Sequence, residues 1–465
     1  MGLKGMHLLT LILTIQFLAH YSLLSAPFQV DEGFYLTSAW LFTKGNIVIK
    51  DFFDVHPPGF SIFGGILFSL FGSSEQTARL AMAILQVLTT AMLFTLGKSV
   101  SDERTALIVS FVYALTEISF GGFRFLADGA LVFLATSSVL ALHFFLRKNN
   151  PQYLIAAGIF TGMMLCVRQS AVFHLLFLIG LLLFTRKRHT NLFISFSLLP
   201  PLIIAIFYII NGGFDRLIEY VFFTPSALSM SFLGRLKPHM VLYAVLFVPL
   251  VISFRDFRKF ITERNTRRTT DTLLIIVWAL SGMTAFFPVP IFLHVLQALP
   301  AIILLTYTSP QVRFVSPIWK HSSSLFRYLS TALFSTIMLF SLYTAYNGGM
   351  IFQEEQVTGM EEFRTYVHAS TKENDTMLAY PHFPVYFFSG RVPASHYMVL
   401  LYYFPEDARE RVLSDIENNR PALFIKADNI SFAPDIESYI TSHYKHEKTF
   451  DYSWFHNISV YRLIE

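Results

Sequence analysis

Apolar stretches long enough to cross a lipid bilayer recur along the chain from Leu8 almost to Leu342. A bilayer core of about 30 Å requires about 20 mostly apolar residues in a helix. By this measure the pattern predicts about eleven transmembrane helices. The predicted spans are Leu8–Leu24, Thr77–Gly97, Ala106–Ser119, Ala130–Leu146, Tyr153–Val167, Ala171–Phe184, Leu192–Ile210, Met240–Phe254, Thr272–Phe287, Ile291–Thr306 and Leu325–Leu342.

One further apolar stretch, Phe60–Phe71, has only about a dozen residues, which is too short to span a bilayer. Pro57 and Pro58 precede it and Gly72 follows it. We therefore expect this stretch to lie along the membrane surface or to enter the membrane only halfway.

The chain beyond Tyr343 has ordinary polarity and shorter periodic segments. Helical patterns cover Met360–His368, Pro405–Asn418 and Ile436–His443, and strand-like runs cover Thr376–Tyr380, Val385–Phe388, Ala422–Ile425 and Ile458–Leu463. We predict a transmembrane domain over residues 1–345, with a loop at 25–76, and a small C-terminal α/β domain over 346–465.

The composition agrees with a membrane protein, because 54% of the 465 residues are hydrophobic and only 14% are charged. The net charge of +4 is small, and the basic residues lie in short loops rather than in a groove, so nucleic acid is not an expected partner. The single cysteine, Cys166, permits no intrachain disulfide. The lipid bilayer is the expected surrounding of the apolar spans.

Basic residues collect in alternate connections between the spans, and such loops face the cytoplasm. The basic positions are Lys98, Arg104, Arg147, Lys148, Arg186, Lys187, Arg188, Arg255, Arg258, Lys259, Arg264, Arg267 and Arg268. An odd number of spans that starts in the cytoplasm places the loop at 25–76 and the C-terminal domain outside. We expect Leu8–Leu24 to remain as a membrane anchor rather than to be cleaved as a signal peptide.

The loop at 25–76 carries an ordered set of polar residues. It contains Val30-Asp31-Glu32-Gly33-Phe34-Tyr35, then Gly45, and then Asp51-Phe52-Phe53-Asp54-Val55-His56-Pro57-Pro58. This pattern resembles the first extracytoplasmic loop of the GT-C glycosyltransferases that use polyprenyl-phosphate sugars. That group includes the family 39 protein O-mannosyltransferases and the bacterial aminoarabinose transferases.

The resemblance extends to about Ser170 and includes Asp128 and the pair Arg168-Gln169; His294 gives a weaker match. It implies an integral membrane GT-C fold and sugar transfer from a polyprenyl-phosphate donor by an inverting displacement. The acceptor in this family is a lipid, a glycan or a protein hydroxyl. The sugar, the acceptor and the carrier lipid are not readable from the residues.

Such a transfer needs a base near the attacking oxygen and positive charge near the departing phosphate. The resemblance makes Asp31 the base, with Glu32 beside it. The alternative is that both carboxylates only cap the helical stretch Tyr35–Phe42. Asp128 is the second catalytic acid by resemblance, and its alternative is an ion pair with Arg124 at i, i+4 spacing.

The expected donor-phosphate contacts are His56, Arg124, Arg168 and Gln169. Arg168 interrupts an apolar hairpin, where an unpaired charge costs at least a few kcal/mol, and a bidentate phosphate suits its guanidinium. The alternative is that Arg168 extends to lipid headgroups. His56 stands where some relatives have lysine, which leaves the donor open.

Tyr35, Asp54 and His294 complete the predicted site as substrate contacts. No metal ligand spacing stands out, so no cofactor is assigned, but the acidic residues with His56 could converge on Mg²⁺ or Mn²⁺. A transporter or flippase is the rival function. Its intramembrane charges would lie near the midplane of the bilayer, whereas these residues lie at one face.

Overall fold

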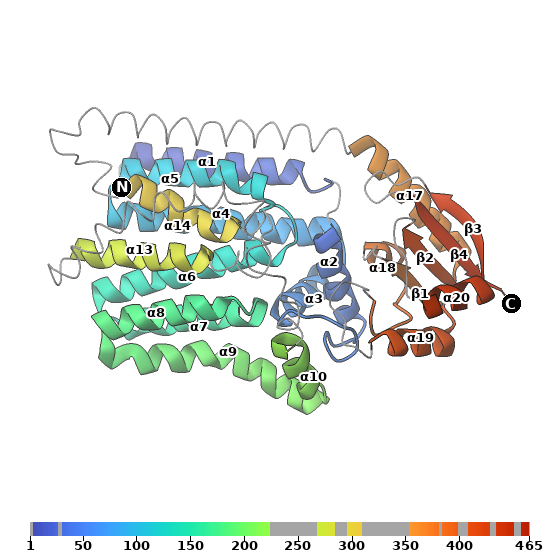
Figure 1. Cartoon of the computed structure of the whole chain (residues 1–465). Coiled ribbons are helices and arrows are strands. Elements are labelled where there is room, and N and C mark those ends of the chain that lie inside the picture. The colour runs from blue at the N-terminus through green and yellow to red at the C-terminus, as the bar shows by residue number, and fades with distance from the viewer. Residues whose placement is uncertain are drawn as a thin grey trace. The chain divides into compact units, whose positions relative to one another are not determined.

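A computed structural model describes residues 3–26, 30–223, 267–283, 295–308, 353–380, 384–398, 408–427, 434–450 and 457–464 (Figure 1). The chain forms two compact units. Among the described elements, the first unit holds α1, most of α4, then α5 to α9, α13 and α14. The second unit holds α2, α3, α10, η3 and every element from α17 onward.

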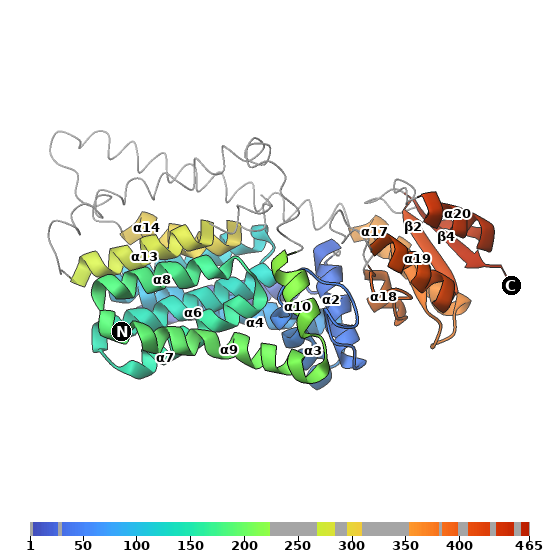
Figure 2. The same ribbon diagram turned by 60° about the horizontal axis from the view of Figure 1, so that its bottom comes forward.

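The first unit is a bundle of helices. Its members are α1 (Leu3–Ser22), α4 (Glu75–Val100), α5 (Glu103–Thr116), η1 (Glu117–Phe120), α6 (Ala127–Lys148), α7 (Pro151–Val167), α8 (Ala171–Thr185), η2 (Lys187–His189), α9 (Thr190–Asn211), α13 (Arg267–Met283) and α14 (Val295–Thr308). Helix α6 packs on α7, α13 packs on α14 and α8, and α14 packs on α5 and α6. Figures 1 and 2 show these helices running side by side.

Short polar turns set the directions of these helices. Asn149 ends α6 in the left-handed region at φ 55°, and the side chain of Asn150 accepts a hydrogen bond from the Gln152 N–H at 3.0 Å. Pro151 occupies the first turn of α7, where no N–H is needed. The four residues from Lys148 to Pro151 therefore encode the tight α6–α7 hairpin.

Two glycines spaced four residues apart bring α7 against α9. A Cβ on Gly158 would lie 2.9 Å from the Phe193 carbonyl oxygen, and one on Gly162 would collide with the Ser197 carbonyl oxygen. Small residues at i and i+4 allow this close approach between membrane helices.

Three described helices are long and apolar enough to cross a membrane: Glu75–Val100, Ala127–Lys148 and Lys187–Asn211. Shorter apolar helices cover Gly59–Phe71, Pro151–Val167, Ala171–Thr185 and Thr270–Met283. The expected spans Met240–Phe254 and Leu325–Leu342 lie outside the described residues. The count of about eleven spans, and the side on which each loop lies, stay predictions.

The second unit combines the first loop, a short segment after α9, and the C-terminal elements. Its helices are α2 (Val30–Thr43), α3 (Gly59–Phe71), α10 (Phe214–Ile218), the π-helix η3 (Glu219–Phe223), α17 (Gln353–Ser370), α18 (Pro384–Ser389), α19 (Ala408–Asn419) and α20 (Pro434–His443). Helix α2 packs on α3 and on α18. The predicted boundary between domains at 345 and 346 stays a prediction.

A four-stranded sheet completes this unit, in the order β1-β2-β4-β3. Its strands are β1 (Met377–Tyr380), β2 (Leu423–Ala427), β3 (Tyr444–Phe450) and β4 (Ile458–Leu463). β1 and β2 are parallel, with Met377 opposite Leu423, and β2–β4 and β3–β4 are antiparallel. All of β1 and most of β2 are buried, so the core of this region lies around them.

One expectation for this region is wrong, and one strand was not predicted. Residues 385–388 form part of the helix α18, because Pro384 favours a helix start and Gly390, at φ 65°, ends it. The strand β3 was not expected, because most of its residues are polar and exposed, with only Tyr444 and Phe450 buried.

Candidate active site

Asp31 and Glu32 lie in the first turn of α2, where helix N–H groups favour negative charge. They are therefore part of the helix start rather than of a loop before it. Asp31 is exposed, whereas Glu32 is fully buried. Of the two carboxylates, only Asp31 is therefore accessible to solvent.

Asp54 and His56 form a pair just before α3. The Asp54 Oδ1 atom accepts hydrogen bonds from the His56 backbone N–H at 2.8 Å and from the His56 Nδ1 atom at 2.9 Å. Asp54 is buried, and its Oδ2 atom has no hydrogen-bond partner within the described part of the chain. About a third of the His56 side chain is exposed. The carboxylate thus orients an imidazole that solvent can reach.

Tyr35 supports this pair by packing. It is buried, and its ring centroid lies 5.0 Å from that of Phe60 and 6.0 Å from that of His56. These contacts explain its position without a substrate, so its predicted role as a substrate contact stays a prediction.

In the first unit, Asp128 is the centre of a second polar group. It lies in the first turn of α6 and is buried. Its Oδ1 atom accepts hydrogen bonds from Arg168 Nη1 at 2.9 Å and from Gln297 Nε2 at 2.5 Å. Three helix ends, from α6, α7 and α14, therefore meet at one carboxylate.

Arg168 and Gln169 form the turn that joins α7 to α8. Arg168 ends α7 in an extended conformation, and its side chain is 17% exposed. Its charge is balanced by Asp128, which offsets the cost expected for a charge between apolar helices. Arg124 precedes α6, and its guanidinium carbon lies 4.9 Å from the centre of the Phe123 ring.

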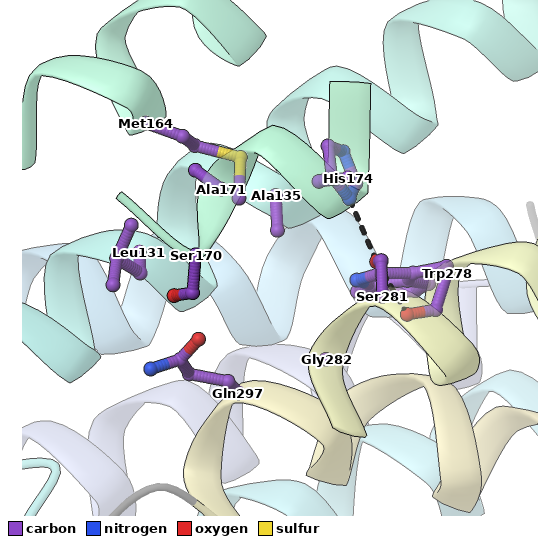
Figure 3. Close-up of a pocket in the computed structure, with 10 residues that line it drawn as sticks. All are labelled: Leu131, Ala135, Met164, Ser170, Ala171, His174, Trp278, Ser281, Gly282 and Gln297. Atoms are coloured by element: carbon purple, nitrogen blue, oxygen red, sulfur yellow. Dashed lines mark hydrogen bonds between the residues drawn. The ribbon is translucent and has the colours of Figure 1, made fainter. Parts of the chain in front are cut away.

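A small cavity lies next to the Asp128 group (Figure 3). Its volume is about 20 Å³, which is room for about one water molecule, so it is too small for a sugar ring in this conformation. It is lined by Leu131, Ala135, Met164, Ser170, Ala171, His174, Trp278, Ser281, Gly282 and Gln297. Gln297 thus belongs both to this wall and to the Asp128 group.

The hydrogen bonds in this wall place a proton on His174 Nδ1. The Ser281 hydroxyl lies 2.8 Å from the Trp278 carbonyl oxygen, which can only accept, so the hydroxyl proton is used there. Ser281 Oγ, 2.8 Å from His174 Nδ1, must then accept from that nitrogen. His174 Nδ1 therefore carries a proton, and within the described residues neither His174 Nε2 nor Trp278 Nε1 has a hydrogen-bond partner.

Sequence reasoning gave no role to two polar residues of the first unit, Gln297 and Glu117. Gln297 was not singled out, because nothing near it in the sequence distinguishes it from other residues of an apolar helix. Glu117 is fully buried, and its Oε1 atom lies 2.6 Å from His20 Nε2 and 3.2 Å from Gln16 Nε2. A glutamate inside an apolar stretch was the available signal, but its partners lie about a hundred residues away.

Two predictions remain open at this site. His294, the weaker family match, lies outside the described residues. Within the described residues, no cluster of three or more His, Cys, Asp or Glu side chains could hold a metal ion. The hypothesis of a divalent cation therefore rests on chemistry alone.

The sequence matches the family model of dolichyl-phosphate-mannose-protein mannosyltransferase over residues 55–212. No curated protein sequence matches the chain. Among solved structures, ArnT from Cupriavidus metallidurans in the apo state matches with a TM-score of 0.64 at 13% identity, over 97% of both chains. The match with ArnT shows that the two chains share a fold, and the family model matches residues 55–212 of this chain.

Two ligand-bound structures also share this fold. ArnT bound to undecaprenyl phosphate matches with a TM-score of 0.62 at 12% identity, again over 97% of both chains. The oligosaccharyltransferase AglB from Archaeoglobus fulgidus, in complex with an inhibitory peptide and a dolichol-phosphate, matches with a TM-score of 0.55 at 12% identity. That match covers 91% of this chain and 70% of AglB. The residues that the family model matches include His56, Asp128 and Arg168 but not Asp31.

Proposed function

We propose that this GT-C protein transfers a sugar from a polyprenyl-phosphate donor to the hydroxyl of an extracytoplasmic acceptor by a single inverting displacement. The observation that carries the proposal is the Arg168–Asp128–Gln297 group at the ends of three apolar helices. ArnT and AglB, which share the fold, bind undecaprenyl phosphate and a dolichol-phosphate respectively. A guanidinium at a helix end suits the phosphate of such a lipid.

In this mechanism the acceptor oxygen attacks the anomeric carbon of the sugar while the bond to the lipid phosphate breaks. The acceptor proton passes to Asp31, the exposed carboxylate at the start of α2. The polyprenyl phosphate leaves with the bonding electrons, and Arg168 balances its charge. By the family resemblance, Gln169, Arg124 and His56 are further proposed contacts of the donor phosphate, and we assign Asp54 to the orientation of His56.

Asp128 has a positioning role in this proposal. Its Oδ1 atom already accepts two hydrogen bonds, so it holds the Arg168 side chain rather than serving as an unoccupied base. The buried Oδ2 atom of Asp54 is the best placed oxygen for a divalent cation, if one takes part. Loss of transfer in a chelator, with recovery on addition of Mg²⁺ or Mn²⁺, would establish a cation; full activity in the chelator would exclude it.

The test is a transfer assay with detergent-extracted protein and a panel of labelled polyprenyl-phosphate hexoses and pentoses. The acceptor fraction would come from membranes of a strain that lacks this protein. A comparison of the glycolipids and glycans of that strain with those of the wild type also reveals the missing product. The proposal expects transfer without any gradient across a membrane. Movement of a lipid or solute in sealed vesicles, with no transfer in detergent, would instead establish a transporter or flippase.

A further inference from the structure

Three segments that are far apart in the sequence meet around the side chain of Phe53, within the second unit. The Phe53 ring is buried, and its centroid lies 4.8 Å from that of Tyr220 and 5.2 Å from that of Tyr397. Tyr220 belongs to η3, and Tyr397 follows α18 in the C-terminal region. Both tyrosines are buried as well, so Phe53 is enclosed on two sides by aromatic rings.

Hydrogen bonds reinforce this contact. The Phe53 backbone N–H donates to the His396 carbonyl oxygen at 2.8 Å. The Tyr220 hydroxyl lies 3.3 Å from the Tyr397 hydroxyl and 3.4 Å from His396 Nε2. The His396 N–H in turn donates to Asp415 Oδ2 at 3.1 Å, which ties the segment to α19. The loop is therefore bonded through its backbone to the C-terminal region.

The turn just before Phe53 also depends on its surroundings. Ile49 is buried at φ 70°, a conformation that a β-branched residue rarely adopts. The Tyr208 hydroxyl donates to the Val48 carbonyl oxygen at 2.6 Å, and the Arg216 guanidinium donates to the Lys50 carbonyl oxygen. Backbone strain of this kind persists only where neighbouring structure holds it, and it is concentrated at functional sites.

Phe53 directly precedes Asp54, whose Oδ1 atom holds His56 through two hydrogen bonds. We propose that Phe53, enclosed by Tyr220 and Tyr397, is a positioning residue through which the C-terminal region holds the Asp54–His56 pair in place. The effect on sugar transfer rests on the proposed function; the effect on the loop does not. An ordinary packing role would predict a loss of stability without a local change in the loop.

Hydrogen exchange in the full-length protein tests the positioning directly. In Tyr397→Leu and Phe53→Leu, we expect the Phe53 amide to exchange about tenfold faster than in the wild type, because an aromatic contact is lost. Tyr397→Phe keeps the ring and loses only the hydroxyl contact with Tyr220, so its exchange should stay closer to that of the wild type than the exchange of Tyr397→Leu does. The control is Tyr439→Leu, since Tyr439 stacks on His443 within α20 rather than on Phe53.

Unchanged exchange at Phe53 in a folded Tyr397→Leu protein would overturn the proposal. If that variant does not fold, Phe53→Leu makes the same test from the side of the loop. A Tyr439→Leu variant that loosens the loop equally would also overturn it, because the effect would then be general destabilisation.

Transfer kinetics provide the second arm. A displacement of the reacting groups by about 1 Å can cost about 100-fold in rate, so kcat/KM should fall by about 10- to 100-fold in Tyr397→Leu and recover in Tyr397→Phe. A loosened loop with full transfer activity would show that Phe53 does not position the site. If the wild type itself transfers no sugar, the proposed function fails, while the exchange arm still decides whether the C-terminal region holds the loop.

Discussion

Replacing Arg168 by alanine separates a phosphate-binding arginine from one that only neutralises Asp128. The Arg168 side chain is 17% exposed, and its Nη1 atom lies 2.9 Å from Asp128 Oδ1. In the proposed function the same guanidinium also contacts the donor phosphate. The substitution removes both interactions at once, so the two effects must be measured separately.

The magnitude follows from these two contacts. A charge-assisted hydrogen bond to the donor is worth roughly 1.5–3 kcal/mol, and this corresponds to a rise in the donor KM of about 10- to 150-fold. Breaking a buried ion pair costs about 3–5 kcal/mol of stability. We expect about 3 kcal/mol or less, because Asp128 keeps its hydrogen bond from Gln297 and both side chains retain some exposure.

The assay titrates the lipid-linked donor at saturating acceptor and compares three variants with the wild type. Arg168→Ala tests the contact with the donor phosphate. The double variant, Arg168→Ala with Asp128→Asn, also removes the negative charge of Asp128, which Arg168→Ala alone leaves without its ion-pair partner. The double variant should recover stability but not the donor KM. Arg104→Ala, at an exposed arginine, is the control. An unchanged donor KM and kcat in a folded Arg168→Ala protein would refute a phosphate contact.

Two further predictions concern topology and pH. Thiol labelling of intact cells should modify Ser442→Cys in α20 but not Arg188→Cys, because both positions are exposed and we expect them on opposite sides of the membrane. The reverse pattern would contradict the topology, and Cys166, which is buried, should contribute little background. Burial, with a contribution from Arg216, lowers the pKa of His396 to about 4. As the pH falls, this histidine is therefore protonated in the unfolded chain at a higher pH than in the folded protein. The free energy of unfolding, measured with urea, should therefore fall as the pH drops from about 6.5 towards 4. This fall should be smaller in His396→Gln, and an equal fall in both proteins would contradict the role of His396.

The hydrophobic pattern located the helices well where polar turns bound them. The span expected at Ala130–Leu146 lies within α6, and that at Tyr153–Val167 lies within α7. The turn residues Asn149 and Asn150 carry this information locally. The aromatic run at 385–388 failed because the pattern of apolar residues does not distinguish a short buried helix from a buried strand.

The sequence named candidate site residues, but it did not predict which of them pair. The family resemblance pointed to Asp128 and Arg168, but it did not predict that they bond each other. Gln297 joins them from 169 positions along the chain, and no local pattern specifies such a contact. The aromatic enclosure of Phe53 was missed for the same reason, because Tyr220 and Tyr397 lie in segments that are separate in the sequence.

The substitution Asp31→Asn tests the central claim most directly, with Glu32→Gln as its matched control. Asparagine keeps the size of aspartate and serves well at a helix start, so a residue that only stabilises α2 would tolerate the change. It cannot take the acceptor proton, and a general base contributes roughly 10²- to 10⁴-fold to the rate. We predict that folded Asp31→Asn loses transfer by this factor and that Glu32→Gln, at the buried position, keeps more activity. An Asp31→Asn protein that retained most of the wild-type transfer rate would contradict the assignment of Asp31 as the base.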